Sequence, residues 1–94
     1  MNVTNYFSKM EAVFETLIID GVESNAKNAN ETTTNLLFCI KNNPDVEDKE
    51  KVIFDVIIRA INSVMVDGRL SEYDKKKEML SLYKGYVKLR YENR

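Results

Sequence analysis

Apolar residues recur at intervals of three and four positions along most of the chain, and this periodicity limits the fold to packed α-helices. The first segment shows it most clearly, with an apolar face made of Val3, Phe7, Met10, Phe14 and Leu17. The pair Asp20-Gly21 follows, and glycine accepts the left-handed backbone conformation that ends many helices. We therefore expect a first helix over residues 3–20.

The second and third segments carry the same periodicity. Residues 24–42 keep helical spacing, although Asn and Thr lower the helix propensity of their first half. Residues 44–67, with Pro44 expected in the first helical turn, are apolar almost all round. Their polar stripe holds only Asp55, Arg59, Asn62 and Ser63. This helix is therefore expected at the centre of the core, with Ile53, Val56, Ile57, Ala60, Ile61 and Val64 buried.

The stretch SVMVDGRLSEYDKK, residues 63–76, is the most motif-like part of the chain. A calcium-binding loop of the EF-hand type would need acidic ligands where Ser63 and Met65 stand, and a glutamate in place of Asp74. Ser71-x-x-Asp74 instead resembles the capping box that opens a helix. We therefore predict a corner between two helices, closed by Asp67-Gly68 in the same way as the first helix is closed.

These segments together predict an all-α fold, namely a small four-helix bundle made of two antiparallel helical hairpins, with self-association as an option. The expected helices cover residues 3–20, 24–42, 44–67 and 71–92 of a single domain, 1–94. In the last helix, the residues expected on the core face are Tyr73, Leu80, Tyr83 and Val87.

Several classes of chemistry lack the residues that they need. The chain has no histidine, which removes Ser-His-Asp and Cys-His nucleophilic arrangements and histidine-ligated metals. Cys39 lies inside LLFCI, where we expect a small buried hydrophobe and not a reactive thiol. None of the three glycines belongs to a phosphate-binding loop. The sequence predicts a non-enzymatic protein without cofactor, metal or small-molecule substrate.

The location of the protein is also an expectation from the sequence. No apolar run approaches the roughly 20 residues that span a bilayer, and the first residues lack the pattern of a secretory signal. A single cysteine fits a reducing compartment. We therefore expect a cytoplasmic protein.

By exclusion, we predict a protein–protein interaction module that binds a partner and inhibits or protects it. Histidine-free helical bundles of this size occur among bacteriocin immunity proteins and phage-encoded inhibitors, which is an analogy of size and fold only. A homodimer is the second form of this hypothesis. The candidate partner-binding residues are apolar side chains away from the main seams and basic side chains of the last helix: Ile58, Val66, Leu82, Leu89, Lys77, Lys84, Lys88 and Arg90.

The alternative hypothesis is a nucleic-acid-binding regulator that acts through the last helix. Residues 69–94 hold 8 basic and 4 acidic side chains, whereas residues 1–68 hold 6 and 11. The basic side chains, Lys75 among them, are interleaved with Tyr83, Tyr86 and Tyr91, which offers cations for phosphates and rings for stacking. The isoelectric point near 5.5 argues against this alternative.

Overall fold

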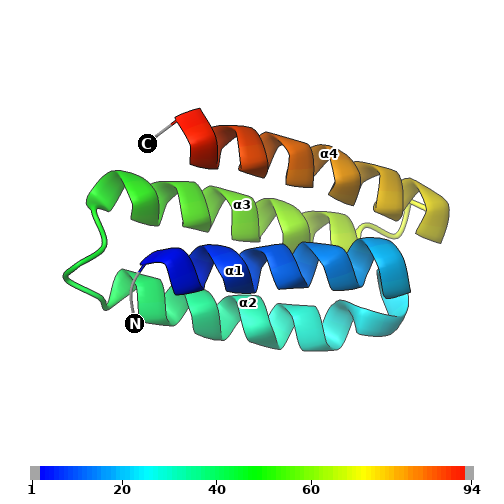
Figure 1. The fold of residues 1–94 in the computed structure, drawn as a ribbon. Coiled ribbons are helices and arrows are strands. Elements are labelled where there is room, and N and C mark those ends of the chain that lie inside the picture. The colour runs from blue at the N-terminus through cyan, green and yellow to red at the C-terminus, as the bar shows by residue number, and fades with distance from the viewer. Residues whose placement is uncertain (1–2, 93–94) are drawn as a thin grey trace.

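The computed structural model describes residues 3–92, with side chains from Asn5 onward, and this part of the chain forms four α-helices and two short helical turns (Figure 1). In chain order they are α1 (Val3–Glu15), the π-helical turn η1 (Thr16–Asp20), the 3-10 turn η2 (Glu23–Asn25), α2 (Ala26–Lys41), α3 (Asp48–Val66) and α4 (Glu72–Glu92). The predicted all-α class is confirmed.

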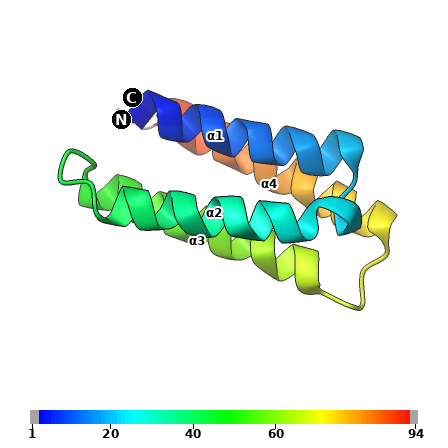
Figure 2. The same cartoon turned by 90° about the horizontal axis from the view of Figure 1, so that it is seen from below.

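The four α-helices run alternately up and down the long axis of the molecule (Figures 1 and 2). α1 packs against α2 and α4, and α3 packs against the same two helices. The order around the bundle is therefore α1, α2, α3, α4, with α1 and α3 on one diagonal. α3 occupies one of four equivalent corners, so the expectation that it is the central helix is wrong.

The periodicity of the first segment places its apolar face in the core as predicted. Met10, Phe14 and Leu17 are fully buried, and Phe7 is partly buried. Val3, which the same pattern assigns to this face, lies outside the described side chains. The ring of Phe14 lies 5.3 Å from that of Tyr83 and 5.6 Å from that of Tyr86, measured between centroids. The seam between α1 and α4 is therefore filled by aromatic rings.

Only one face of α3 reaches the core, and this corrects two predictions from its sequence. Val56 was expected in the core but is 58% exposed, whereas Ile58, expected to be available to a partner, is only 4% exposed. The buried face consists of Phe54, Ile57, Ile58, Ile61 and Met65. A helix at one corner of a bundle buries a single stripe, so the surplus apolar residues of α3 remain outside.

The register of α4 also differs from the prediction. Tyr73 and Leu80 were expected on the core face but are 71% and 41% exposed. The buried positions are Lys75, Met79 and Tyr86. Burial raises the pKa of the Tyr86 phenol well above its ordinary value, and its hydroxyl donates to the Phe7 carbonyl over 3.3 Å. The large tyrosine fixes the register because it fills the space between α1 and α4.

The two Asp-Gly corners are closed by different means. Gly21 has the expected positive φ of 123°, but its ψ of 143° lies outside the left-handed helical region that was predicted for this corner. Gly68 has no positive φ, so the second corner does not repeat this device. There the Asp67 carboxylate accepts hydrogen bonds from the backbone and side chain of Arg69, and these bonds lower the pKa of Asp67 to about 2.

Glu72 connects the second corner to the first. Its Oε1 atom accepts hydrogen bonds from the backbone N–H groups of Val22 (2.6 Å) and Glu23 (3.1 Å), so it caps η2 in the other hairpin. The Ser71 hydroxyl accepts from the Asp74 N–H at 3.1 Å, which confirms the predicted cap of the last helix. The stretch 63–76 is therefore a structural corner that also ties the two hairpins together.

The third helix begins later than predicted. Pro44 belongs to a turn in which the Asn43 side-chain oxygen accepts from the Asp45 N–H at 2.8 Å, and α3 starts only at Asp48. Asn43 also donates to the Tyr6 hydroxyl at 2.8 Å, which anchors the turn to α1. This side-chain turn competes with helix formation at the residues after Pro44.

Replacing Gly85 with alanine is expected to raise the free energy of unfolding by about 0.5–1 kcal/mol, because glycine is unfavourable inside a helix. Gly85 lies within α4, and a Cβ atom added there would meet no atom within 4 Å. Chemical denaturation followed by circular dichroism measures the change. A lower free energy of unfolding in the variant would contradict the open surroundings of Gly85.

Candidate functional site

The structure distributes the four predicted apolar contact residues over different parts of the surface. Val66, the last residue of α3, is 78% exposed, and Leu89 is 37% exposed. Leu82 is partly buried against the core, and Ile58 belongs to the core. Val66, Leu82 and Leu89 therefore remain candidates, and Ile58 does not.

The four predicted basic residues differ in how far they are already engaged. Lys84 is exposed, and the Lys77 amine lies 5.6 Å from the ring centroid of Tyr73. Lys88 forms an ion pair with Glu92 at 3.9 Å on the same helix. Arg90 is ion-paired with Glu11 of α1, and its side chain is 19% exposed. Its guanidinium lies 4.8 Å from the ring centroid of Phe7, so Arg90 belongs to the packing between α1 and α4.

The nucleic-acid hypothesis loses part of its surface in this arrangement. Tyr86 is fully buried, and Lys75 is 6% exposed and paired with Glu23 at 3.4 Å. Lys77, Lys84 and Lys88 stay exposed on α4 beside the exposed Tyr91. What remains is a short basic stripe with two exposed rings, Tyr73 and Tyr91, at its ends.

One flank of α3 turns towards α4 and can be identified from the contacts on the opposite flank. The Asn62 side chain accepts from Asn30 of α2 at 2.7 Å, and Asp55 forms an ion pair with Lys41 of α2 at 3.4 Å. Since an α-helix turns about 100° per residue, Val56 and Ala60 lie on the far side of these contacts. This flank of α3 therefore faces the α4 side of the bundle.

The matching flank of α4 follows from the same reasoning. Tyr83 and Arg90 mark the side that contacts α1, through Phe14 and Glu11. Leu82, Gly85 and Leu89 follow one another in steps of three and four residues, about a quarter turn away from that side. Because α1 and α3 lie on either side of α4, this line of residues borders α3.

The two flanks form one apolar area, here called the α3/α4 face. It consists of Val56, Ala60, Leu82, Gly85 and Leu89, together with Val52, which lies about 40° around the helix from Val56 on the outward surface of α3. Val52 is 61% exposed and Val56 is 58% exposed, while Ala60 and Leu82 are partly buried. The beginning of α3 and the end of α4 lie at the same end of the bundle (Figure 1). Val52 and Leu89 lie towards this end, and Val56 lies near the middle of α3.

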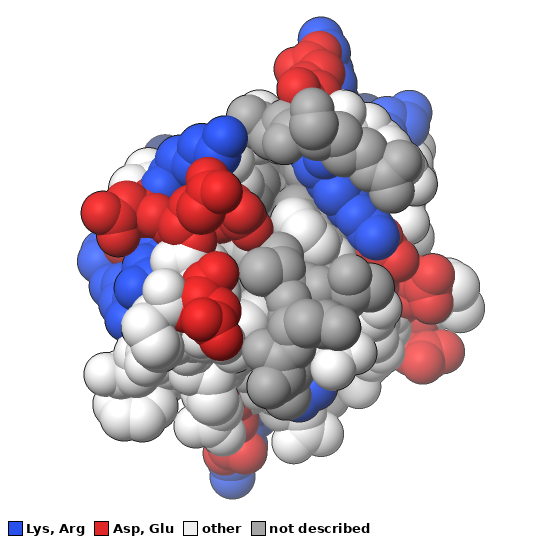
Figure 3. Space-filling view, turned by 60° about the vertical axis from the view of Figure 1, so that its left-hand side comes forward, with Lys and Arg blue, Asp and Glu red and all other residues white. Residues whose placement is uncertain are grey.

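Charged side chains surround this end of the bundle. Figure 3 looks towards it and shows groups of Lys and Arg next to groups of Asp and Glu, separated by uncharged residues. Lys49, in the first turn of α3, pairs at 3.6 Å with Glu47, which precedes that helix. In α4, Lys88 pairs with Glu92. An apolar area with a polar rim is the arrangement found at protein–protein interfaces.

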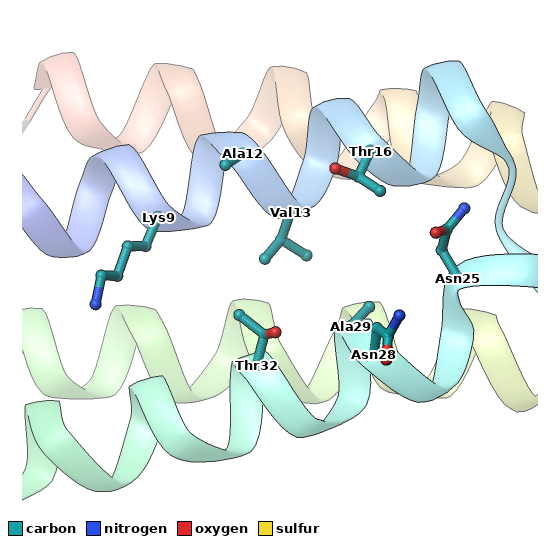
Figure 4. Close-up of a pocket in the computed structure, with 8 residues that line it drawn as sticks. All are labelled: Lys9, Ala12, Val13, Thr16, Asn25, Asn28, Ala29 and Thr32. Carbon is teal, nitrogen blue, oxygen red and sulfur yellow. The ribbon is translucent and has the colours of Figure 1, made fainter.

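The opposite side of the bundle carries a polar groove between α1 and α2, here called the α1/α2 groove. A cavity of about 410 Å³ is lined by Lys9, Ala12, Val13, Thr16, Asn25, Asn28, Ala29 and Thr32 (Figure 4). A second cavity of about 210 Å³ is lined by Tyr6, Lys9, Thr32, Asn35, Leu36 and Cys39. Lys9 and Thr32 line both cavities, so the two form one elongated groove.

The groove exists because short side chains fill the seam between α1 and α2. Ala12 and Thr16 stand on one wall, and Asn28, Ala29 and Thr32 stand on the other. The corresponding seam between α1 and α4 is filled by aromatic rings instead. Cys39 was expected to be buried but is exposed at this groove, because its side of α2 turns towards α1 and not into the core.

Neither surface was predicted from the sequence. Val52 and Val56 were hidden in a helix that is apolar almost all round, and Asn28, Thr32 and Asn35 counted only as weak helix formers. Asn28, Thr32 and Asn35 are four and three residues apart, which places them on one side of a helix, and this spacing was the one signal in the sequence for the groove.

Two further properties concern the described residues. Within residues 3–92, no three His, Cys, Asp or Glu side chains are placed to hold a metal ion together. In the same range, no helix is both long enough and apolar enough to cross a membrane.

Comparisons with known proteins complete the description. No protein-family model, curated protein or solved structure matches this chain.

Proposed function

We propose that this protein is a non-enzymatic interaction module that binds a partner protein through the α3/α4 face and thereby inhibits or protects the partner. The observation that carries the proposal is the exposure of Val52 and Val56 beside Leu89, in a helix whose core face is already complete without them.

The chemistry of this face favours a protein partner. Burying a valine or leucine side chain contributes about 1.5–3 kcal/mol, and three such residues, Val52, Val56 and Leu89, are exposed on this face. A Cβ atom added at Gly85 would meet no atom within 4 Å, so the surface there is open to a side chain of a partner. The ion pairs at the rim match a partner with mixed charges better than a uniformly charged polymer.

The proposal is tested with the double variant Val52→Lys/Val56→Lys. Both positions are exposed, so the variant is expected to keep the wild-type melting temperature within a few degrees. Its affinity for the partner is expected to fall at least tenfold, because two charges would be buried without counter-charges. Affinity purification from native lysate with tagged wild type identifies the partner, and titration calorimetry with the purified pair measures the affinity.

The matched control is Val66→Lys, a valine of the same helix that is more exposed but lies at the opposite end of α3. We expect this control to bind the partner as the wild type does. Equal binding by wild type and double variant would refute the assignment of the face. Sedimentation velocity of the purified wild type adds a check, because a dimer that the double variant abolishes would show that a second copy, not another protein, covers the face.

A further inference from the structure

We propose that the α1/α2 groove is a second binding site, and that it takes an extended peptide segment of about five residues whose acidic side chain pairs with Lys9. The groove and the α3/α4 face lie on opposite seams of the bundle, because the helices follow one another in the order α1, α2, α3, α4 around it. The two sites can therefore be occupied together, and each can be tested without the other.

The first argument is the unused hydrogen-bonding capacity of α2 on the groove side. On its α3 side, the Asn30 amide donates to Asn62, and the buried Thr33 hydroxyl donates to the Ala29 carbonyl at 2.8 Å. On its α1 side, no side-chain hydrogen bond joins Asn28, Thr32 or Asn35 to another group within residues 3–92. Two amides and a hydroxyl thus line the groove as free donors and acceptors. Figure 4 shows two of these side chains, Asn28 and Thr32.

The second argument is that this set matches the main chain of a peptide. An extended chain has no internal hydrogen bonds, so its N–H and C=O groups need partners such as an asparagine amide, which both donates and accepts. Asn28 and Asn35 are about 10.5 Å apart along the axis of α2. In a polyproline-II chain, groups three residues apart point the same way at about 9.3 Å, so one peptide can reach both amides.

The third argument is the length of the groove. From Asn28 to Cys39 α2 rises by about 16 Å, which corresponds to about five extended residues. The apolar floor runs beneath both cavities and is formed by Ala12, Val13 and Ala29 in the first and by Tyr6 and Leu36 in the second. A partner helix would bring backbone groups that are already hydrogen-bonded to the polar wall formed by α2, so an extended segment fits the groove better.

The fourth argument is charge. Lys9 is the one charged residue that lines either cavity, and no carboxylate pairs with it within residues 3–92. It lines both cavities and therefore stands near the middle of the groove. A carboxylate side chain in the middle of the bound segment would supply the missing counter-charge.

The test uses an array of random seven-residue peptides, acetylated and amidated at their ends, probed with the full chain. The wild type is expected to retain peptides enriched in Asp or Glu at one central position. Lys9→Gln is expected to bind the best of these peptides about tenfold more weakly, which corresponds to the loss of one charge-assisted hydrogen bond. Lys9→Glu is expected to change the selected central residue to Lys or Arg.

Cys39 provides an independent readout because it is the single cysteine of the chain and lines the groove. Saturating peptide is expected to slow its alkylation by iodoacetamide several-fold. Lys27→Gln, a matched charge removal on the exposed side of α2, should leave both readouts unchanged. Val52→Lys/Val56→Lys should also leave them unchanged, which separates this site from the α3/α4 face.

Three results would overturn the proposal. The first is an array on which wild type enriches no acidic peptide. The second is an unchanged selection by Lys9→Glu, which keeps the fold because Lys9 is exposed. The third is binding without any slowing of Cys39 alkylation, since the peptide would then occupy another surface.

Discussion

Replacing Phe14 with alanine is expected to lower the free energy of unfolding by about 3–5 kcal/mol, the range found when a buried aromatic residue is removed from a core. Phe14 is fully buried, and its ring packs against those of Tyr83 and Tyr86, so truncation leaves a cavity between α1 and α4. A domain of this size has a total free energy of unfolding of about 5–15 kcal/mol. The variant is therefore expected to be only marginally folded at 37 °C.

Phe38→Ala is the matched control, because it removes the same side chain from α2 at a position that is 69% exposed. We expect a change of about 0.5 kcal/mol or less for this control. Urea denaturation followed by circular dichroism at 222 nm measures both variants on the same scale. Similar losses in the two variants would mean that Phe14 does not hold α1 against α4 in the way described.

Replacing Gly21 with alanine is expected to lower the free energy of unfolding by about 2–3 kcal/mol, because two costs add at this position. With φ 123° and ψ 143°, the backbone is close to a region that only glycine visits readily. A Cβ atom there would also lie 2.9 Å from the Ser24 hydroxyl oxygen and 3.2 Å from Glu72 Oε1. The substitution therefore disturbs the carboxylate that caps η2.

The two costs can be separated with further variants. Gly68→Ala is the control, because Gly68 has no positive φ and a Cβ atom there would meet nothing within 4 Å. Glu72→Ala removes the capping carboxylate alone and is expected to cost about 1–3 kcal/mol. If the Gly21→Ala penalty were unchanged in a Glu72→Ala background, backbone strain and the close contact with Ser24 would account for all of it. Equal stability of Gly21→Ala and wild type would falsify the account of this corner.

The two proposals together describe one mode of action. A module with an apolar face on one seam and a peptide groove on the opposite seam can hold two partners, or two parts of one partner, at a fixed separation. Such a function needs shape, hydrogen-bonding groups and charge, but no reactive group. It is therefore compatible with a chain that contains no histidine.

The sequence by itself determined the helical architecture and most of the contacts that are local along the chain. Helical spacing identified the buried residues Met10, Phe14 and Leu17 of α1, because burial recurs with the period of the helix. The local cap at Ser71 and the positive φ at Gly21 could also be predicted, because each depends on a few consecutive residues. Pro44 misled the prediction, since the Asn43 side chain formed a competing turn that propensity alone does not reveal.

Only the tertiary structure decided which apolar residues remain outside and where the surfaces lie. Helical spacing cannot set the rotation of a helix that is apolar almost all round. For this reason Val56, which was expected in the core, is exposed, and Ile58, which was expected outside, is buried. The rotation of α4 is fixed by Tyr86 packing against α1, a contact between residues far apart in the chain. The α1/α2 groove likewise arises only when two helices with short side chains become neighbours. Contacts within one helix follow from the order of its residues, whereas the surfaces proposed here depend on which faces the four helices turn towards one another.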